Sequence, residues 1–217
     1  MTTPPTVAPA RRRGLADEVA DRIREAIFNG SYAPGSQLRE VELSGALDVS
    51  RGPVREALLR LEREGLVRSE WHRGATVTDL TPEDVAELDS LRGALETLAV
   101  RLVIEHATDA DLDQIDQAVV RMERAADAHE MVRGDLAFHD AVYAAAHHRR
   151  LGEAWAAIRN QVHLFLLTRI HRSTQDYLSH IPAEHRALTE SLRAKDTEAA
   201  LAAFAEHRHH AFDILSR

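Results

Sequence analysis

The sequence contains no cysteine, which excludes disulfide bonds, thiolate metal sites and cysteine nucleophiles. Aromatic residues make up only 5% of the 217 residues, and glycine and proline are sparse after residue 82. No apolar run approaches the ~20 residues that a membrane-spanning helix requires, and the N-terminal segment lacks the apolar core of a signal peptide. We therefore expect a mainly α-helical protein in a reducing compartment, the cytoplasm, with no membrane partner.

Charge is divided unevenly along the chain. The totals are 27 Lys+Arg and 35 Asp+Glu, a formal net charge of −8. Residues 1–76 carry 12 Arg against 11 Asp+Glu, which leaves 15 basic and 24 acidic residues after residue 76. Twelve of the 13 histidines also lie in that second part. Two domains with different roles are the simplest explanation, and the chain is long enough for both.

The first part of the chain has the pattern of a helix-turn-helix. Apolar residues recur at helical spacing from Leu15 to Ile27, and a short helix is expected from about residue 40 to 47. After a tight connection at Asp48-Val49, Ser50 can cap a third helix, and Pro53 falls in the first turn of that helix. The buried stripe of the third helix comprises Val54, Leu58 and Leu61.

The third helix is predicted to contact DNA. With its apolar stripe turned to the core, Arg51, Gly52 and Arg55 face outward at its N-terminal end, the end that reads base edges in this motif. Arginine matches the O6 and N7 acceptors of guanine, and the Ser50 hydroxyl suits a phosphate oxygen. For an isolated Arg-rich helix the alternative is a solvated face with pairs such as Glu56–Arg60. The ordered succession of cap, turn and hairpin favours DNA binding.

A β-hairpin is expected in GLVRSEWHRGATV, residues 65–77. Its two ends are β-prone and flank a tip at residues 71–74. This hairpin would be the wing of a winged helix, in which Arg73 or His72 reaches a phosphate or the minor groove. We therefore expect a disordered basic arm at 1–13, a winged helix-turn-helix domain at 14–78 and a linker at 79–81.

Residues 82–217 are expected to form an all-helical bundle of about six helices. Thr81-Pro82-Glu83-Asp84 is a helix start, with Thr as the cap and Pro at the first position. Gly152 and Pro182 are expected near helix starts rather than in helix interiors, and no strand pattern is present. The predicted helices span 82–106, 109–128, 130–147, 151–172, 176–194 and 196–215.

Three histidines and one carboxylate are predicted to meet inside this bundle. Asp135 and His139 are four residues apart and share a helix face with Phe138, so both point inward. His185 and His207 lie on the apolar faces of two later helices. Imidazole and carboxylate ligands suit Zn, Ni, Mn or Fe, with positions left for water or a carboxylate ligand.

Two other interpretations of these histidines stay open. In a chain with 13 histidines, some face inward by chance and serve as hydrogen-bonded core residues. In addition, His210 lies close to the same inward face and competes with His207 as a ligand.

Arg92 is a second unusual residue, because it lies on the apolar stripe of the first helix of the bundle. Burying a lone guanidinium is costly, so it requires a partner. Glu96, one turn away, is one candidate partner, and an arginine that reaches solvent is equally ordinary.

Three segments of the first domain, AIFNGSYAPGSQL, VSRGPVREALLRLEREGLV and HRGATV, are similar to the winged helix of the GntR family of bacterial transcription regulators. Two positions depart from the family pattern: Gly52 stands where most members have Thr or another side chain, and Val41 stands where some carry an Arg. The resemblance implies DNA contacts at or beside Arg39, Ser50, Arg51, Gly52, Arg55 and Gly74.

Residues 82–215 resemble the FCD ligand-binding domain found in one subfamily of these regulators. The matching features are an Asp three residues before Phe-His, an acidic-His pair at 184–185 and a histidine 22 residues later. The resemblance implies a metal site, often zinc, whose shell is completed by the carboxylate of an effector. The metal ligands would be Asp135, His139, His185 and His207. The effector pocket would comprise Arg92, facing the carboxylate, with Glu96, Asn160 and His163.

The expected function is therefore a DNA-binding transcription regulator, usually a repressor in this family, and not an enzyme. It would bind a double-stranded operator as a homodimer, and a small organic acid at the metal would change its DNA affinity. One rival is a metal-dependent enzyme with a DNA-binding appendage, for which Glu96 and Glu184 are the candidate bases. The other is a regulator whose polar pocket holds no metal.

Overall fold

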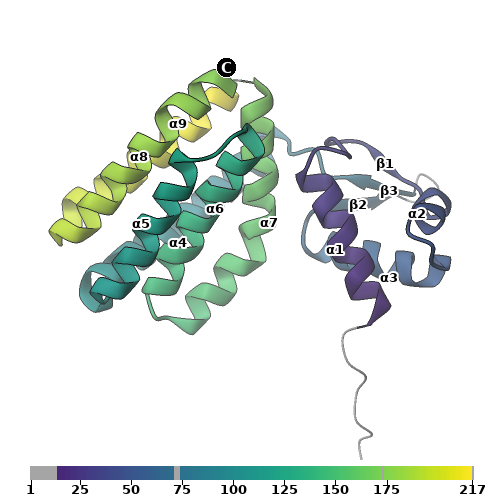
Figure 1. Cartoon of the computed structure of the whole chain (residues 1–217), viewed down its shortest axis with the longest axis horizontal. Coiled ribbons are helices and arrows are strands. Elements are labelled where there is room, and N and C mark those ends of the chain that lie inside the picture. Colours follow the sequence, from purple (N-terminus) through teal and green to yellow (C-terminus); the bar gives the residue numbers. More distant parts are fainter. Residues whose placement is uncertain (1–13, 71–73, 173, 217) are drawn as a thin grey trace, which may run out of the picture. The chain divides into compact units, whose positions relative to one another are not determined.

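The structure is a computed structural model that describes residues 14–70, 74–172 and 174–216. The predicted basic arm, His72 and Arg73 lie outside these residues. The chain forms two compact units: residues up to Arg63 together with Val67–Val77, and Glu64–Leu66 together with Thr78 onward. Figure 1 shows the first unit as helices packed with a small sheet and the second as a helical bundle.

The first unit is a winged helix-turn-helix, as the sequence predicts. Val54, Leu58 and Leu61 are 0–5% exposed, so the predicted stripe of the third helix faces the core. Asp48 takes φ 52° in the turn between the second and third helices, a left-handed conformation that Asp tolerates. The helices are α1 (Leu15–Phe28), α2 (Glu40–Ala46) and α3 (Arg51–Arg63).

The wing is part of a three-stranded antiparallel sheet. The predicted hairpin is formed by β2 (Val67–Glu70) and β3 (Gly74–Val77), in the register Val67 opposite Val77. The sequence analysis missed β1 (Gln37–Leu38), which pairs with the other side of β3 and makes the strand order β1-β3-β2. A two-residue strand has no periodicity of its own, and only its pairing with β3 defines it.

The second unit is the predicted helical bundle. The Thr81 side chain accepts a hydrogen bond from the Asp84 amide, and Asp84 bonds back to Thr81, which completes a capping box at the start of α4. None of the described helices combines the length and apolar composition that crossing a membrane requires. The helices are α4 (Pro82–His106), α5 (Asp109–Glu123), α6 (Ala128–Ala145), α7 (Arg149–Arg172), α8 (Thr174–Ala194) and α9 (Thr197–Ser216).

One expectation about this bundle is wrong: Pro182 lies in the interior of α8 rather than near its start. An interior proline removes one helix hydrogen bond and disfavours the helix by about 3 kcal/mol. Ile181 and His185, on either side of it, are fully buried, and Leu188 is 2% exposed. The burial of this face therefore outweighs the local preference.

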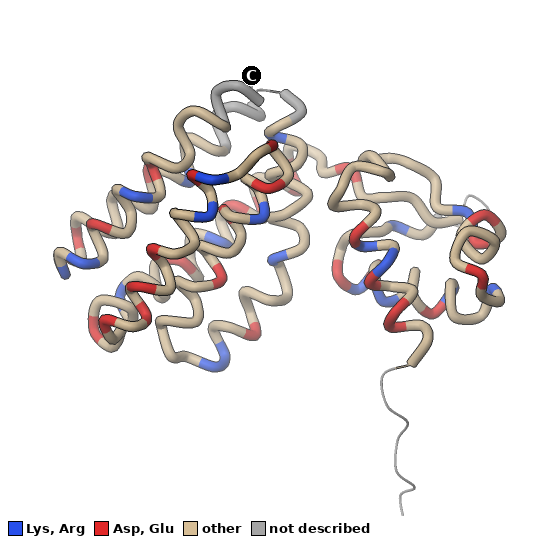
Figure 2. The backbone as a smooth tube through the Cα atoms, in the orientation of Figure 1, with Lys and Arg blue, Asp and Glu red and all other residues tan. Residues whose placement is uncertain are grey.

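The helix that carries Asp135 and His139 packs closely on its neighbour because of one glycine. A Cβ added at Gly134 would lie 2.5 Å from Met122 Cγ and 3.3 Å from the Met122 backbone, so α6 approaches α5 more closely than a side chain would permit. Figure 2 shows acidic and basic residues interspersed over both units.

We expect Gly134→Ala to lower the free energy of unfolding by about 1–3 kcal/mol, because the new methyl group forces α5 and α6 apart. Gly152→Ala is the matched control, since a Cβ at this α7 position meets nothing within 4 Å. That change should raise the free energy of unfolding by up to ~1 kcal/mol through helix propensity. Urea denaturation of both variants is the measurement, and equal effects would contradict the close contact.

Candidate functional site

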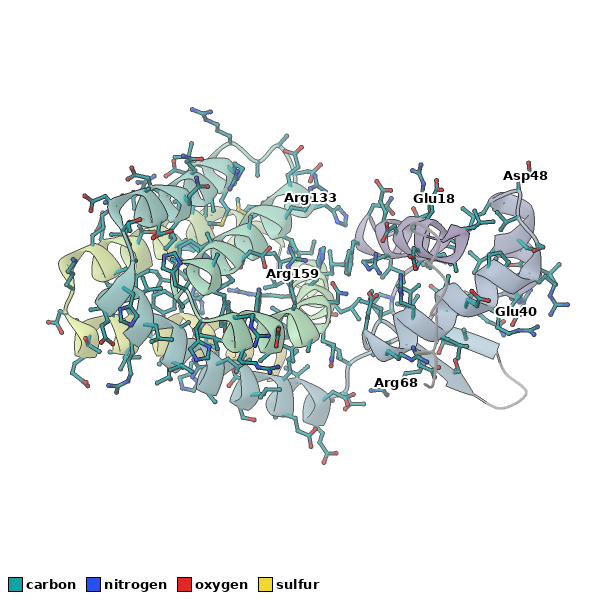
Figure 3. The ribbon with its side chains drawn as sticks, turned by 90° about the horizontal axis from the view of Figure 1, so that it is seen from below. Glu18, Glu40, Asp48, Arg68, Arg133 and Arg159 are labelled. Atoms are coloured by element: carbon teal, nitrogen blue, oxygen red, sulfur yellow. The ribbon has the colours of Figure 1, made fainter. Side chains whose placement is uncertain are left out.

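In the first unit, the two outward-facing arginines of α3 bind the same carboxylate, that of Glu40. Arg51 donates from Nη2 to Glu40 Oε2 at 2.8 Å, and Arg55 donates from Nε to Oε1 and from Nη2 to Oε2, both at 3.0 Å. Both arginine side chains are about 60% exposed, at 58% and 62%, so their outer edges remain open to solvent. Glu40 is labelled in Figure 3.

Glu40 fixes the direction of these guanidinium groups. Hydrogen bonds from Arg55 and Arg51 lower the pKa of the Glu40 carboxyl to about 2, so it is ionised at any physiological pH. Arginine has five N–H donors in a rigid fork, and the edges turned away from Glu40 can still meet a base or phosphate. The sequence analysis did not single out Glu40, because the 11 and 15 residues that separate it from its partners carry no periodic signal.

The other predicted DNA contacts surround this pair. A groove of about 630 Å³ is lined by Arg39, Glu40, Arg51, Arg55 and Gly74, among others. Ser50 and Gly52 are exposed at the start of α3. A Cβ at Gly52 would meet nothing within 4 Å, so packing does not require glycine there. The glycine instead leaves open space beside the two arginines.

In the second unit, the three predicted histidines meet in the core. His139, on α6, His185, on α8, and His207, on α9, offer ring nitrogens that all lie within 4.8 Å of one another. Their rings are 0–6% exposed. Asp135 joins them, with Oδ1 3.4 Å from His139 Nε2 and 3.5 Å from His185 Nε2. All four side chains predicted as metal ligands are therefore brought together.

His210, the competing candidate, lies outside this cluster. It is exposed, and its Nδ1 lies 2.7 Å from Glu184 Oε1. His207 Nδ1 lies 2.9 Å from the other oxygen of the same carboxylate. Glu184 thus bridges an inner and an outer histidine, and only the inner one faces Asp135.

Neighbouring acceptors fix the tautomers of two of these rings. His185 Nδ1 lies 2.9 Å from the Ile181 carbonyl, which can only accept, so Nδ1 donates and Nε2 keeps a lone pair. His207 Nδ1 donates to Glu184 in the same way. Burial raises the pKa of Glu184, but the hydrogen bonds from His207 and His210 outweigh it and bring the value to about 2. Such partners orient the histidines of metal sites.

His139, the third ring, also has its lone pair on Nε2, but because of a donor rather than an acceptor. Arg92 Nη2 donates to His139 Nε2 at 2.7 Å, so that nitrogen also carries a lone pair. Burial, followed by the Arg92 charge, lowers the pKa of His139, and burial is the main cause that lowers the pKa of His207 to about 4. Both rings are therefore neutral near pH 7, which is the form that binds metals.

The contact between Asp135 and His185 brings two hydrogen-bond acceptors together. Burial raises the pKa of Asp135, but the interactions with His185 and His139 outweigh it and hold the pKa well below its usual range, which requires a positive charge among these rings. An ionised Asp135 oxygen thus faces the Nε2 lone pair of His185 at 3.5 Å, and that Nε2 has no hydrogen-bond partner among the described residues. A cation is required between them, either a proton or a metal ion. One proton can bridge only one pair of these atoms, whereas a divalent metal ion can bind all of the converging nitrogen and oxygen lone pairs. The residues present therefore fit a metal ion.

Arg92 and Glu96 form a buried charged network beside the cluster. Arg92 Nη2 lies 3.4 Å from Glu96 Oε1, and Arg208, on α9, donates to Glu96 Oε2 at 3.1 Å. Arg208 also reaches Asp89, and it crosses α4 over Gly93, where a Cβ would lie 2.9 Å from Arg208 Cζ. Glu96 is therefore the internal partner expected for Arg92, and it is shared with a second arginine that the sequence analysis did not identify.

Asn160 and His163 are the other two residues predicted for the effector pocket. The Asn160 amide donates to Glu64 at 2.9 Å, away from the network of Arg92. His163 is 5% exposed, and burial followed by the Arg159 charge lowers its pKa to about 3. The structure therefore does not bring Asn160 to the cluster, and it leaves His163 as a neutral buried ring.

Tyr143 is a buried residue that interacts electrostatically with Glu96, Arg92 and Arg208, and the sequence analysis did not single it out. Its ring stacks on Trp155 at 4.5 Å, and its buried hydroxyl has no hydrogen-bond partner among the described residues. Burial, followed by the charge of Glu96, raises the pKa of this hydroxyl, so it remains a neutral donor. Its position four residues after His139 on the same helix is the signal that would have found it.

Comparisons with known proteins match both units. Residues 15–77 match the family model described as "Bacterial regulatory proteins, gntR family", and residues 79–210 match the FCD domain. An uncharacterized HTH-type transcriptional regulator of Bacillus subtilis, YdhC, is 32% identical over 195 residues, 88% of this chain and 86% of that protein. The gluconate operon transcriptional repressor of the same organism is 30% identical over 186 residues, 82% of this chain and 75% of the repressor.

A solved structure agrees with these matches. A GntR transcriptional regulator from Rhodococcus sp. RHA1 has a TM-score of 0.80 and 29% identity, and the likeness covers 93% of this chain and 97% of that one. The matched family and relatives are transcription regulators rather than enzymes, as expected from the sequence.

Proposed function

The chain belongs to the gntR family of bacterial regulatory proteins and carries an FCD domain, and from that premise we propose that it is a transcription repressor controlled by a small carboxylate bound at a metal ion. The observation that carries the proposal is the convergence of three histidine lone pairs and the Asp135 carboxylate in the core of the FCD unit. A helical core that required only apolar packing would contain no such acceptor cluster.

We propose zinc as the metal, since neutral imidazoles with one carboxylate are ligands that zinc prefers; nickel, manganese and iron share this donor preference. A bound divalent ion would supply positive charge and open positions for an effector carboxylate. Asp135, His139, His185 and His207 would hold it, with Ile181 and Glu184 orienting two of the rings.

Arg92 supplies the second half of the carboxylate site. In the structure it donates to the His139 Nε2 lone pair that a metal ion also requires. If that nitrogen held a metal ion, the Arg92 guanidinium would keep Glu96 as its partner and would have donors free for a carboxylate. The neutral Tyr143 hydroxyl is a further donor next to this pair.

We propose sugar acids as the first effectors to test. Two relatives are named as repressors of a gluconate operon and of a galactonate operon, and both acids carry a carboxylate beside several hydroxyl groups. A carboxylate suits the metal and Arg92, and hydroxyl groups suit Glu96 and Tyr143. Effector binding would shift the FCD unit between two conformations, and ~1–3 kcal/mol of coupling would change operator affinity about 5- to 150-fold.

The first unit would bind the operator through α3 in the major groove, as part of a homodimer with two recognition helices about one DNA turn apart. Arg51 and Arg55 would contact base edges, and Arg39, Ser50, Gly52 and Gly74 would lie at or beside the phosphate backbone. Arg73, also proposed for the backbone, lies outside the described residues.

We expect Arg55→Ala to abolish the specific operator footprint, because each bidentate arginine–base contact is worth about 1–3 kcal/mol. Glu40→Gln should weaken the discrimination between operator and unrelated DNA, since the two arginines lose their shared anchor. Arg22→Ala is the control, because Arg22 is an exposed arginine on α1 of the same unit. Footprints unchanged in Arg55→Ala would remove α3 from the groove.

We expect untagged protein to contain one metal ion per chain by elemental analysis, and His139→Ala and His185→Ala to lose it. The same variants should lose the thermal stabilisation that added zinc gives the native protein, which is about 2.7 kcal/mol at 100 times the dissociation constant. His210→Ala is the matched control and should keep its metal. Full metal content in both core variants would show that the site is misplaced, and a metal-free native protein that still responds to an effector would favour the metal-free alternative.

Arg92→Gln should raise the concentration of effector required for operator release at least tenfold, because the substitution removes a charged fork from the carboxylate. The effector used would be the acid that most stabilises the zinc-loaded protein in a thermal-shift screen of gluconate, galactonate and other small carboxylates. Operator affinity without effector should stay within about twofold, which separates this change from misfolding. An unaltered dose response would exclude Arg92 from the pocket.

A further inference from the structure

The outer side of α4 exposes apolar residues that no other described part of the chain covers. Leu91 and Leu98 are 47% and 41% exposed, among the few large apolar side chains that the described residues leave in solvent. Ala94, between them, is also exposed. Figure 3 shows α4 along the lower edge of the helical unit, with side chains directed away from the other helices.

These residues belong to a regular seam. Exposed residues recur at intervals of four, three, four and three along α4, which places them in one narrow stripe of the helix surface. This alternation is the spacing by which two helices pack in a coiled coil. The seam comprises Glu87, Leu91, Ala94, Leu98 and Arg101.

We propose that a second copy of this chain packs on the seam, with the two α4 helices antiparallel about a two-fold axis near Ala94. The proposal rests on the homodimer of the proposed function and assigns its contact. Two-fold symmetry brings Leu91 of one copy onto Leu98 of the other, and Ala94, the smallest residue of the seam, permits close approach at the axis.

The charges at the two ends of the seam fit this arrangement. Glu87 and Arg101 lie seven residues before and after Ala94, so an antiparallel pair sets Glu87 of each copy opposite Arg101 of the other. Neither side chain has an ion-pair partner among the described residues. They cannot meet within one chain, because 14 residues of helix separate them by about 21 Å. A second copy is the partner that satisfies both.

The contact is short. Asp84 and Glu105, one layer further out, are both acidic and would face each other in the same arrangement, so the close packing ends at Glu87 and Arg101. The contact would have three central layers, at Leu91, Ala94 and Leu98, and one ion pair at each end. An interface of this size can adjust when a ligand binds, unlike a large rigid core.

The opposite side of the same helix carries the sensor residues. Arg92 and Glu96 are 4% and 1% exposed and face the histidine cluster, while the seam faces away from it. A change of partner at Arg92 therefore acts on the helix that forms the dimer contact. This is a direct physical route from the pocket to the geometry of the dimer.

Charge reversal tests the seam. We would measure self-association of the native protein, Glu87→Arg and Arg101→Glu by sedimentation equilibrium, and then of an equimolar mixture of the two variants. Each variant alone places like charges at both ends of the seam, so its dimer dissociation constant should rise more than about tenfold. In the mixture every Arg at position 87 or 101 faces a Glu of the partner copy, so mixed dimers should form with near-native affinity.

Glu190→Arg, the same reversal at an exposed site on α8, is the control and should dimerise normally. Native-like dimers in both single variants would overturn the seam while leaving a dimeric regulator intact. Monomeric variants whose mixture stays monomeric would also overturn it, because Glu87 and Arg101 would then not face each other across the dimer. A native protein that is monomeric even when it saturates its operator would contradict the dimer of the proposed function itself.

Discussion

The need to place a positive charge among buried acceptor atoms is the constraint on which the helical unit depends. The four clustered side chains are at most 6% exposed, and their acceptor atoms point at one another. They are Asp135, His139, His185 and His207. Removing such groups from water without compensation costs several kcal/mol each, so the fold has to supply partners. The surrounding residues do so from the outside: Ile181 and Glu184 take the outer N–H groups of two rings, which leaves their inner lone pairs for a cation.

The same reasoning explains why charged residues continue beyond the cluster. Arg92 is the positive charge nearest to His139, and it is itself held by Glu96, which Arg208 shares. Arg92 and Glu96 are buried and Arg208 is half-buried, and each has an opposite charge within about 3.5 Å, so removing one leaves another uncompensated. In the first unit the arrangement is similar but exposed: Glu40 holds two arginines whose free edges face solvent. A carboxylate orients arginine in both units, and our proposal assigns one arrangement to a small ligand and the other to DNA.

Local pattern was sufficient to predict the helices, the hairpin of β2 and β3, and the inward direction of the key side chains. The i, i+4 spacing of Asp135 and His139 put both on the apolar face of α6, and the stripe of α3 left Arg51 and Arg55 outside. What sequence periodicity could not supply were contacts between distant segments. Glu40 with its arginines, Arg208 with Glu96, and β1 with β3 all join positions whose separation has no fixed rule. Local propensity places Pro182 near a helix start, whereas the burial of Ile181 and His185 holds it inside α8.

X-ray absorption spectroscopy at the zinc edge of zinc-loaded protein is the most direct test of the cluster as a metal centre. Our account predicts three imidazole nitrogens and at least one oxygen about 2.0–2.2 Å from the ion. A spectrum without imidazole scattering, or a protein that binds no zinc at neutral pH, would contradict it.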